Sequence, residues 1–372
     1  MRTTTAHCIV LVSTILAVLS PAVLLSQSAE SSPGINRPVT REEIDRLRRT
    51  IYDETQSNFE GIFVYHSESG DLNNRLNFYR LGARGNFKLD SGALLYLGGT
   101  WTPYSTLNDS FAASGANATF GLKTNLAESV VSQFEAGATR FSTGGSTINA
   151  LASFDFSFTN ASLNFTASRT NVEESLLSAA GIRPVTGPFA GRTVGQVMDN
   201  RAVVSGTYQL REKLDVFGNG GTGYRKGVEV DSNPFWLGGG GVGYNVISAP
   251  AEESISLLRA SYEANYIGYR DNRLGFGGSP ASVGGYFSPE TFFNHVIRGE
   301  LRGAAGGSLE YQVSGFVGSQ YITGSSRRQA AGFSGMVSVR ISDRYSLPVT
   351  FARDNFGPFT QESVFARLVV RF

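Results

Sequence analysis

Residues with catalytic potential are sparse in this sequence. Beyond position 28 the histidines are His66 and His295, which lie far apart and lack the spacing of metal ligands. Asp271 and Glu290 are carboxylates of the kind that glycosidases use as an acid and base pair. No nucleophile motif accompanies either set. The sequence therefore predicts no enzyme, no catalytic residue and no metal site, and an outer-membrane hydrolase with His66 or His295 as its base is kept only as an alternative.

Cofactor and nucleic-acid binding are excluded on similar grounds. Gly218, Gly220 and Gly223 form a G-x-G-x-x-G pattern, which binds dinucleotides only when a helix follows it. Here the flanking residues alternate in polarity and no helix is expected, so no cofactor is predicted. The formal net charge is +1, from 32 basic and 31 acidic residues, which lacks the positive field that nucleic acids require. Cys8 is the only cysteine, so the chain after it has no thiolate chemistry and no disulfide.

Charged side chains instead recur at every second position, opposite apolar ones. This alternation is typical of strands with one face toward water and one toward an apolar medium. A charge that faces lipid at mid-bilayer costs about 2 to 4 kcal/mol, so we assign the charged face to a water-filled lumen. Its mixed signs suit any hydrated pore, and also a conduit that hydrogen-bonds sugar hydroxyls. The predicted lumen or polysaccharide-contacting residues on this face are Arg80, Arg84, Arg259, Glu263, Arg298, Glu300, Arg302 and Arg367.

The elements that position these residues are short strands separated by turn-forming residues. No stretch after the first 28 residues approaches the roughly 18 uninterrupted apolar residues of a membrane helix, so any membrane span must use strands. An even number of strands, about sixteen, fits residues 59–372 as one antiparallel transmembrane β-barrel. The predicted strand starts are Phe59, Arg75, Ala93, Ala113, Val130, Thr147, Ala161, Asn200, Leu214, Pro234, Ile255, Phe292, Leu309, Ala330, Ser346 and Gln361.

The first 58 residues predict export and a short helix. Arg2 and the apolar run from Cys8 to Leu25 are typical of a signal peptide over residues 1–28, which cleavage removes before the chain reaches the outer membrane. Residues 29–58 are expected to form a periplasmic linker and one short amphipathic helix, begun by the capping pair of Thr40 and Glu43.

The carboxy terminus also predicts an outer-membrane location. Val364, Leu368 and Phe372 share one face of the last strand, and Arg367 lies on the other. A terminal Phe on such a strand resembles the signal that the barrel assembly machinery reads. That machinery and outer-membrane lipid are therefore expected partners.

Two glycine- and proline-containing segments interrupt the strands. Residues 172–181 read VEESLLSAAG, and residues 284–289 read GGYFSP. A long connection in a compact fold is usually functional, so the first segment and the residues after it predict a gating or plug loop. Tyr286 and Phe287 either stack on sugars at a pore mouth or belong to the aromatic girdle. The candidate loop residues are Leu177, Gly181, Pro184, Gly187 and Gly191.

Together these two segments resemble the carboxy-terminal domain of the cellulose synthase operon protein C family. The resemblance covers residues 40–372 and implies a sixteen-stranded outer-membrane porin that exports a nascent β-linked exopolysaccharide, typically cellulose. A general diffusion porin for small solutes is the main alternative. Family members carry tetratricopeptide repeats before the barrel, and no repeat of about 34 residues occurs here. A separate periplasmic scaffold and an inner-membrane synthase complex are therefore expected partners.

Overall fold

The computed structural model describes residues 57–70, 76–106, 112–251, 253–273, 284–355 and 359–372. The predicted signal peptide and nearly all of the predicted linker and helix lie outside these residues. The described residues form sixteen strands and one short helix, whose bounds are β1 (Asn58–Gly70), β2 (Asn77–Lys88), β3 (Leu94–Ser105), β4 (Ala113–Ala127), β5 (Val130–Phe141), β6 (Ser146–Ser157), β7 (Ala161–Asn171), α3 (Leu176–Ala179), β8 (Gly195–Arg211), β9 (Leu214–Val228), β10 (Val230–Ser248), β11 (Leu257–Tyr269), β12 (Phe292–Ala305), β13 (Leu309–Ile322), β14 (Arg328–Arg340), β15 (Tyr345–Asp354) and β16 (Phe359–Arg371).

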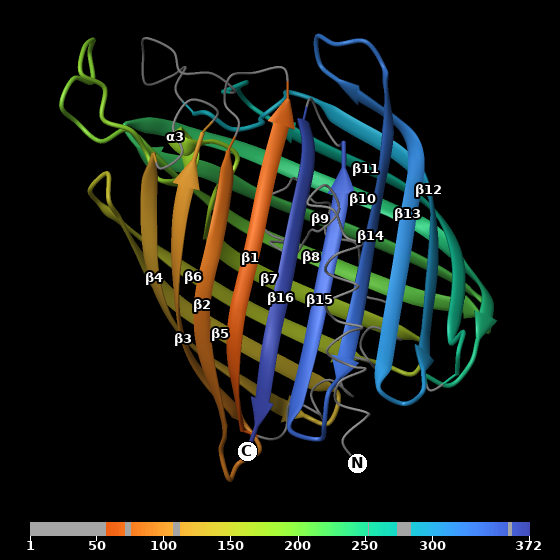
Figure 1. Ribbon diagram of the computed structural model, residues 1–372. Helices are drawn as coiled ribbons and strands as arrows, with labels where there is room; N and C mark the ends of the chain where they lie inside the picture. The colour runs from red at the N-terminus through yellow and green to blue at the C-terminus, as the bar shows by residue number, and fades with distance from the viewer. Residues whose placement is uncertain (1–56, 71–75, 107–111, 252, 274–283, 356–358) are drawn as a thin grey trace.

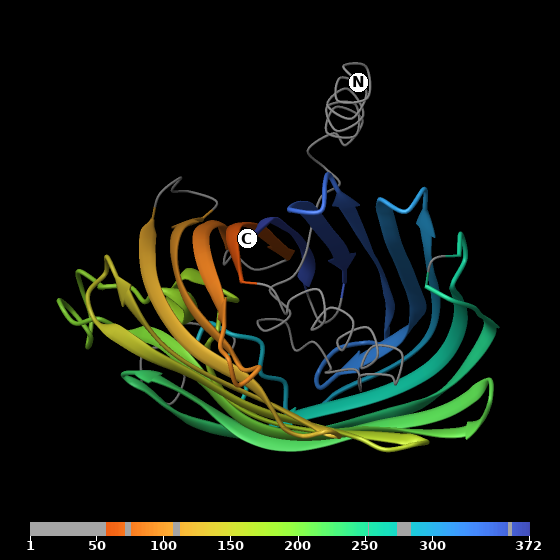
Figure 2. The same ribbon diagram turned by 90° about the horizontal axis from the view of Figure 1, so that it is seen from below.

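The strands close into a single antiparallel barrel. Each strand pairs with its neighbours along the chain, and β1 pairs with β16, so that Phe63 lies opposite Ala366. Closure leaves none of the sixteen described strands with an unpaired edge. Figure 2, which views the barrel end-on, shows the strands as an elongated ring. The prediction of an all-β antiparallel barrel of about sixteen strands is confirmed.

Side chains alternate between the two faces of the wall, as the sequence pattern predicted. Outward positions expose large apolar groups such as Trp101 at 45%, Trp236 at 57% and Ile297 at 63%. Lumen positions between them carry polar groups such as Glu60 and Thr102, which are buried. An apolar outside and a polar inside are the arrangement of a barrel that sits in a bilayer. Among the described residues, no helix is long and apolar enough to span a membrane.

The two ends of the barrel differ in the length of their connections. Residues 172–194 connect β7 to β8, and the described residues 270–273 and 284–291 belong to the connection between β11 and β12; both sets lie at the end opposite the carboxy terminus. Figure 1 shows α3 at that same end. Barrels of this type carry their longer loops on the outside of the cell and short turns in the periplasm. We therefore refer to the end that holds α3 as the loop end.

Candidate functional site

The connection between β7 and β8 begins with a tightly capped helical turn. Ser175 caps α3, because its side chain accepts a hydrogen bond of 3.1 Å from the backbone N–H of Ser178. Gly181 ends the turn at a φ of +76°, a conformation that favours glycine. Gly195, which starts β8, lies against α3 so closely that a Cβ there would come within 1.9 Å of the Leu177 carbonyl oxygen. The short helix is therefore fixed against the start of β8.

This turn joins two walls of the lumen. Ala179 and Ala180 pack into an apolar cluster on the β1–β5 side, which includes Val64 and Phe78. Leu177 packs into a second cluster, formed on the β8–β13 side together with the connection between β11 and β12. Ser178, Ala179 and Ala180 are all fully buried. Residues 172–182 therefore cross the lumen at the loop end and narrow it.

On the first wall, the crossing segment is held by Glu173. Its carboxylate accepts hydrogen bonds from Arg80 of β2 at 2.5 Å and from the hydroxyl of Tyr104 of β3 at 2.9 Å. Arg80 also donates to the hydroxyl of Thr102 at 3.1 Å. The guanidinium group therefore bonds both to the barrel wall and to the crossing segment, so Arg80 anchors that segment.

On the second wall, Glu174 is held by Arg225 of β9. The distance between Arg225 Nη1 and Glu174 Oε1 is 2.8 Å, and Arg225 Nε donates to Asp199 at 3.0 Å. Only 1% of Arg225 is exposed, and its guanidinium lies 4.9 Å from the ring centre of Tyr286. An arginine this deeply buried is stable only when its N–H groups are bonded, so the contacts with Glu174 and Asp199 are essential to it.

The second loop segment is bound to the first. The backbone N–H of Phe287 donates to Glu174, and Arg225 donates to the Phe287 carbonyl at 3.2 Å. The Ser175 hydroxyl donates to the carbonyl of Gly285 at 2.5 Å. Residues 172–182 and 284–288, which we call the loop plug, are therefore one bonded unit that Arg225 fastens to the wall.

Burial governs the ionisation of Glu174. It raises the pKa of this carboxyl to about 7 from an ordinary value of 4.5, although the neighbouring Arg225 acts in the opposite direction and Glu68 of β1 adds to the increase. In an undocked loop the carboxyl would meet water and titrate near its ordinary value. The docked plug therefore binds more protons than the undocked one between about pH 4.5 and 7.

This difference predicts that the reconstituted barrel opens more readily as the pH rises. The free energy that Glu174 contributes to docking of the loop plug is fully present below its ordinary pKa of 4.5 and is lost as the pH rises through about 7. Single-channel recordings at stepped pH should show an open probability that increases over that interval. Glu174→Gln, which stays neutral at every pH, should flatten the dependence. An unchanged dependence in this variant would contradict the assignment to Glu174.

The predicted loop residues occupy two different environments. Leu177 and Gly181 are buried in the loop plug. Gly187 and Gly191 are exposed, and Pro184 lies beside them, since its carbonyl accepts a hydrogen bond of 2.9 Å from the N–H of Gly191. The connection is thus divided into an inner part that crosses the lumen and an outer part that faces solvent. Its role as a gate stays a prediction.

Tyr286 and Phe287 lie in neither of the two predicted places. Tyr286 is fully buried and Phe287 is 4% exposed, both within the apolar cluster that contains Leu177. They form no part of an outward girdle, and no ring face is open to a polymer while the plug is docked. Packing against Arg225 and the first loop segment accounts for this placement, which the sequence could not anticipate because the partners are distant in the chain.

The other predicted residues lie on the lumen face, where ion pairs neutralise them. Contact with a polysaccharide stays a prediction for all of them. Each arginine pairs with at least one carboxylate of the wall or the loop plug. The pairs are Arg80 with Glu173, Arg84 with Glu60 at 3.0 Å, Arg259 with Asp215, Arg298 with Glu263 at 2.9 Å, Arg302 with Glu300, and Arg367 with Glu60 at 3.5 Å.

Aromatic rings accompany these arginines in the lumen. Arg84 lies 5.2 Å from the ring centre of Tyr96, and Arg298 lies 4.9 Å from that of Phe316. Such pairs hold a flat ring in a fixed orientation beside a hydrogen-bond donor. The combination suits weak contacts with sugar rings and their hydroxyl groups.

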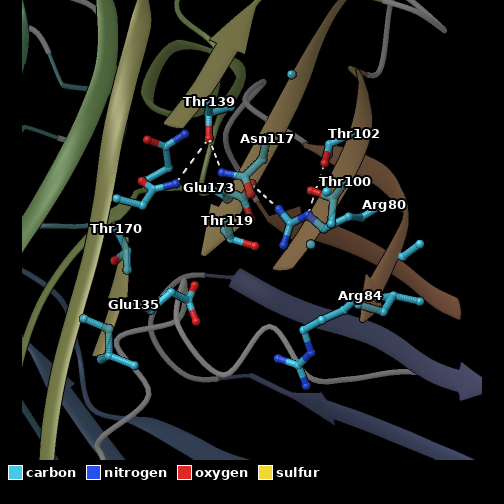
Figure 3. Close-up of a pocket in the computed structure, with 18 of the residues that line it drawn as sticks. Arg80, Arg84, Thr100, Thr102, Asn117, Thr119, Glu135, Thr139, Thr170 and Glu173 are labelled. Atoms are coloured by element: carbon cyan, nitrogen blue, oxygen red, sulfur yellow. Dashed lines mark hydrogen bonds and ion pairs between the residues drawn. The ribbon is translucent and has the colours of Figure 1, made fainter. Parts of the chain in front are cut away.

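A cavity of about 430 Å³ opens along the β1–β7 side of the lumen. Figure 3 shows its wall, in which Asn117 reaches Thr139 at 2.9 Å and Arg80 reaches Glu173. Most of its side chains are neutral hydrogen-bonding groups rather than charges. The lining includes Arg84, Tyr96, Thr100, Thr102, Asn117, Thr119, Glu135, Thr139, Asn149 and Thr170. Among the residues that the structure describes, no group of three or more His, Cys, Asp or Glu could hold a metal ion.

Comparison with protein families shows which family the chain belongs to. The family model described as "Cellulose synthase operon protein C C-terminus" matches residues 85–331. The chain belongs to this family. Both segments of the loop plug lie inside the matched range. No curated protein matches the chain.

One solved outer-membrane barrel shows that this member of the family shares its fold. A "Bacterial polysaccharide outer membrane secretin" aligns with a TM-score of 0.62 and 12% identity, over 84% of this chain and 98% of that chain. OmpF of Salmonella typhi, solved in complex with daunomycin, aligns with a TM-score of 0.38 and 9% identity, over 86% of this chain and 98% of that chain.

Sequence reasoning did not identify the residues that fasten the plug. Glu173 and Glu174 belong to the segment that carries the family resemblance, yet neither was selected as a site residue. Arg225 and Asp199 were missed because their strand alternation looks the same as that of any lumen charge. One signal was available: two adjacent acids in an otherwise small and apolar loop are costly to bury without basic partners.

Proposed function

We propose that the chain exports a nascent exopolysaccharide through the barrel lumen to the cell surface, and that the polymer is cellulose or a related β-linked glucan. The observation that carries this proposal is the family match over residues 85–331. The fold supports it, because the barrel that aligns over 98% of its own length is that of a bacterial polysaccharide outer membrane secretin.

The chemistry of the lumen supports a moving polymer. The lumen arginines named above pair with carboxylates, and the cavity offers hydroxyl, amide and aromatic groups such as Thr119, Asn117 and Tyr96. Each such contact exchanges a hydrogen bond to water for one to sugar, so its net contribution is only about 0.5 to 1.5 kcal/mol. Low affinity at each step lets a chain advance without being trapped.

The proposal includes a location and partners. After removal of residues 1–28, the barrel is inserted into the outer membrane by the assembly machinery and is surrounded by lipid. A synthase complex in the inner membrane drives the polymer, and a separate periplasmic scaffold guides it to the barrel. The lumen itself does no chemical work, and the chain acts as a conduit rather than an enzyme.

Deletion of the gene with measurement of secreted polymer tests this proposal. We expect polymer that a β-glucan hydrolase digests to disappear from the cell surface and to return when the gene is restored. Unchanged polymer together with lost uptake of small solutes would support a general diffusion porin instead. Hydrolysis of lipid or glycan by purified protein, abolished by replacing His66 or His295, would support a hydrolase.

A further inference from the structure

An outward-facing polar cluster lies near the loop end, on β12 and β13. His295 pairs with Ser319 across these strands. Their neighbours on the same face are strongly exposed, Ile297 at 63% and Val317 at 52%. Asn294, which follows the opposite parity, is fully buried. His295 and Ser319 therefore face outward in a wall that is otherwise apolar there.

Arg327 completes this cluster from the connection between β13 and β14. Its Nη2 lies 2.7 Å from His295 Nε2, and its Nε donates to the Ser319 hydroxyl at 2.8 Å. The Ser319 hydroxyl lies 3.0 Å from the same imidazole nitrogen. Three hydrogen-bonding side chains from three segments thus converge on one outward point.

The cluster differs from the lumen arginines in its charge. Among the described residues, Arg327 pairs with no carboxylate, whereas each lumen arginine discussed above pairs with at least one. An uncompensated guanidinium beside lipid is unfavourable. Arginine presents a planar set of N–H donors that fits phosphate oxygens, so a phosphate would supply the missing charge.

Aromatic rings around the cluster place it at the level of lipid headgroups. The ring of His295 lies 6.2 Å from that of Tyr262 and 6.1 Å from that of Phe293. Both neighbours are exposed, and Tyr321 lies on the same face. Aromatic residues concentrate where the apolar belt of a barrel meets the headgroup layer. A long Arg side chain above this belt can extend toward that layer.

We infer that Arg327, His295 and Ser319 form a binding site for the phosphate headgroup of an outer-leaflet glycolipid. The guanidinium and the serine hydroxyl donate to phosphate oxygens, and the imidazole adds a third polar contact. The exposed rings of Tyr262 and Phe293 accommodate the sugar and the upper acyl chains. The site rests on the proposed membrane location and orientation of the barrel, and is independent of the exported cargo.

Lipid retention by the purified full chain tests this site. Protein in detergent is incubated with diphosphorylated lipid A, or with lipid A from which the phosphates have been removed, and bound lipid is counted by native mass spectrometry. We expect retention of the phosphorylated lipid only, and about tenfold weaker retention in Arg327→Ala, since charge-assisted hydrogen bonds are lost. His295→Gln should weaken it less. Arg344→Ala, which removes an exposed charge at the other end of the barrel, should retain lipid as the parent chain does.

Equal retention of the phosphorylated and dephosphorylated lipids would overturn the site. So would retention at the level of the parent chain in both Arg327→Ala and His295→Gln. Displacement of the lipid by inorganic phosphate alone at millimolar concentration would also overturn it, because it would indicate an ion site. A heat-modifiable band on gels identifies variants that fold, and Ser319→Ala supplies a third variant. Polymer export should be unchanged in Arg327→Ala. Loss of lipid binding with normal export would separate this inference from the proposed function, and bound lipid without any export would refute the function alone.

Discussion

Arg225→Ala is expected to convert a mostly closed barrel into one with long-lived openings of larger conductance. Arg225 holds Glu174, Asp199 and the Phe287 carbonyl at once, with 1% of its surface exposed. Above about pH 7, where Glu174 is ionised, the substitution leaves this buried carboxylate without a basic partner, which costs about 3 to 5 kcal/mol. That energy corresponds to a change of about two to four orders of magnitude in the docking equilibrium of the loop plug. Recordings from single barrels in planar bilayers measure the change.

A matched control lies in the outer part of the same connection. Arg192 pairs with Glu229 at 2.8 Å, but the two side chains are 54% and 33% exposed. An exposed pair of this kind contributes about 0 to 1 kcal/mol, so Arg192→Ala should conduct like the parent chain. Glu174→Ala should reproduce the effect of Arg225→Ala. Recordings from folded Arg225→Ala barrels that match those of the parent would show that Arg225 does not fasten the plug.

Asp215→Asn is expected to destabilise the barrel and to shift the pore toward anions. Arg259 forms two hydrogen bonds with the Asp215 carboxylate, at 2.5 and 2.6 Å, and its side chain is 4% exposed. The substitution leaves the guanidinium buried without its counter-charge, again at a cost of about 3 to 5 kcal/mol. The lumen also gains one positive charge. The heat-modification temperature on gels should fall, and the reversal potential in a salt gradient should move toward anion preference.

The double variant Asp215→Leu with Arg259→Leu separates the two effects. Replacing both members of a buried ion pair by apolar residues often leaves the stability unchanged, so the double variant should regain stability and ion preference close to those of the parent chain. If Asp215→Asn proved as stable as the parent chain and left the reversal potential unchanged, Asp215 and Arg259 would not form the buried ion pair described here. The change in anion preference between Asp215→Asn and the parent chain then measures how strongly this ion pair affects the ion selectivity of the lumen.

Most strand positions could be predicted because each wall residue meets either lipid or water. The predicted starts at Ala113, Val130, Ala161, Leu214, Phe292 and Leu309 agree with the structure. β8 was placed at Asn200, whereas it begins at Gly195. The loop plug covers this early part of β8, so Val197 and Met198 are both buried and the alternation disappears. A period-two pattern cannot reveal a strand whose two faces are both covered.

β10 differs from its predicted start for a second reason. It begins at Val230 rather than Pro234, directly after Glu229 at a φ of +54°. The pairing with β9 is irregular between Val230 and Asn233. Proline usually marks the start of a strand, but here it follows a bulge, where its missing N–H is tolerated.

The site could be predicted only in part. Alternation is sufficient to assign Arg80, Arg259 and Arg298 to the charged face, because that assignment depends on one strand at a time. The loop plug depends on contacts between residues far apart, such as Ser175 with Gly285 and Glu174 with Arg225. No local pattern encodes these pairings, and so Tyr286 was expected at a pore mouth or in the aromatic girdle rather than in a buried cluster.

Labelling of a single lumen cysteine tests most directly whether polymer passes through the barrel. Thr119 lines the cavity on the lumen face of β4, and Ser342 lies in an exposed turn at the other end. In cells that are making polymer, Thr119→Cys should be protected from a small thiol reagent, and it should react when synthesis is stopped. Ser342→Cys should react in both states, and the parent chain gives the background. Equal labelling of Thr119→Cys in both states would contradict the passage of polymer through this lumen.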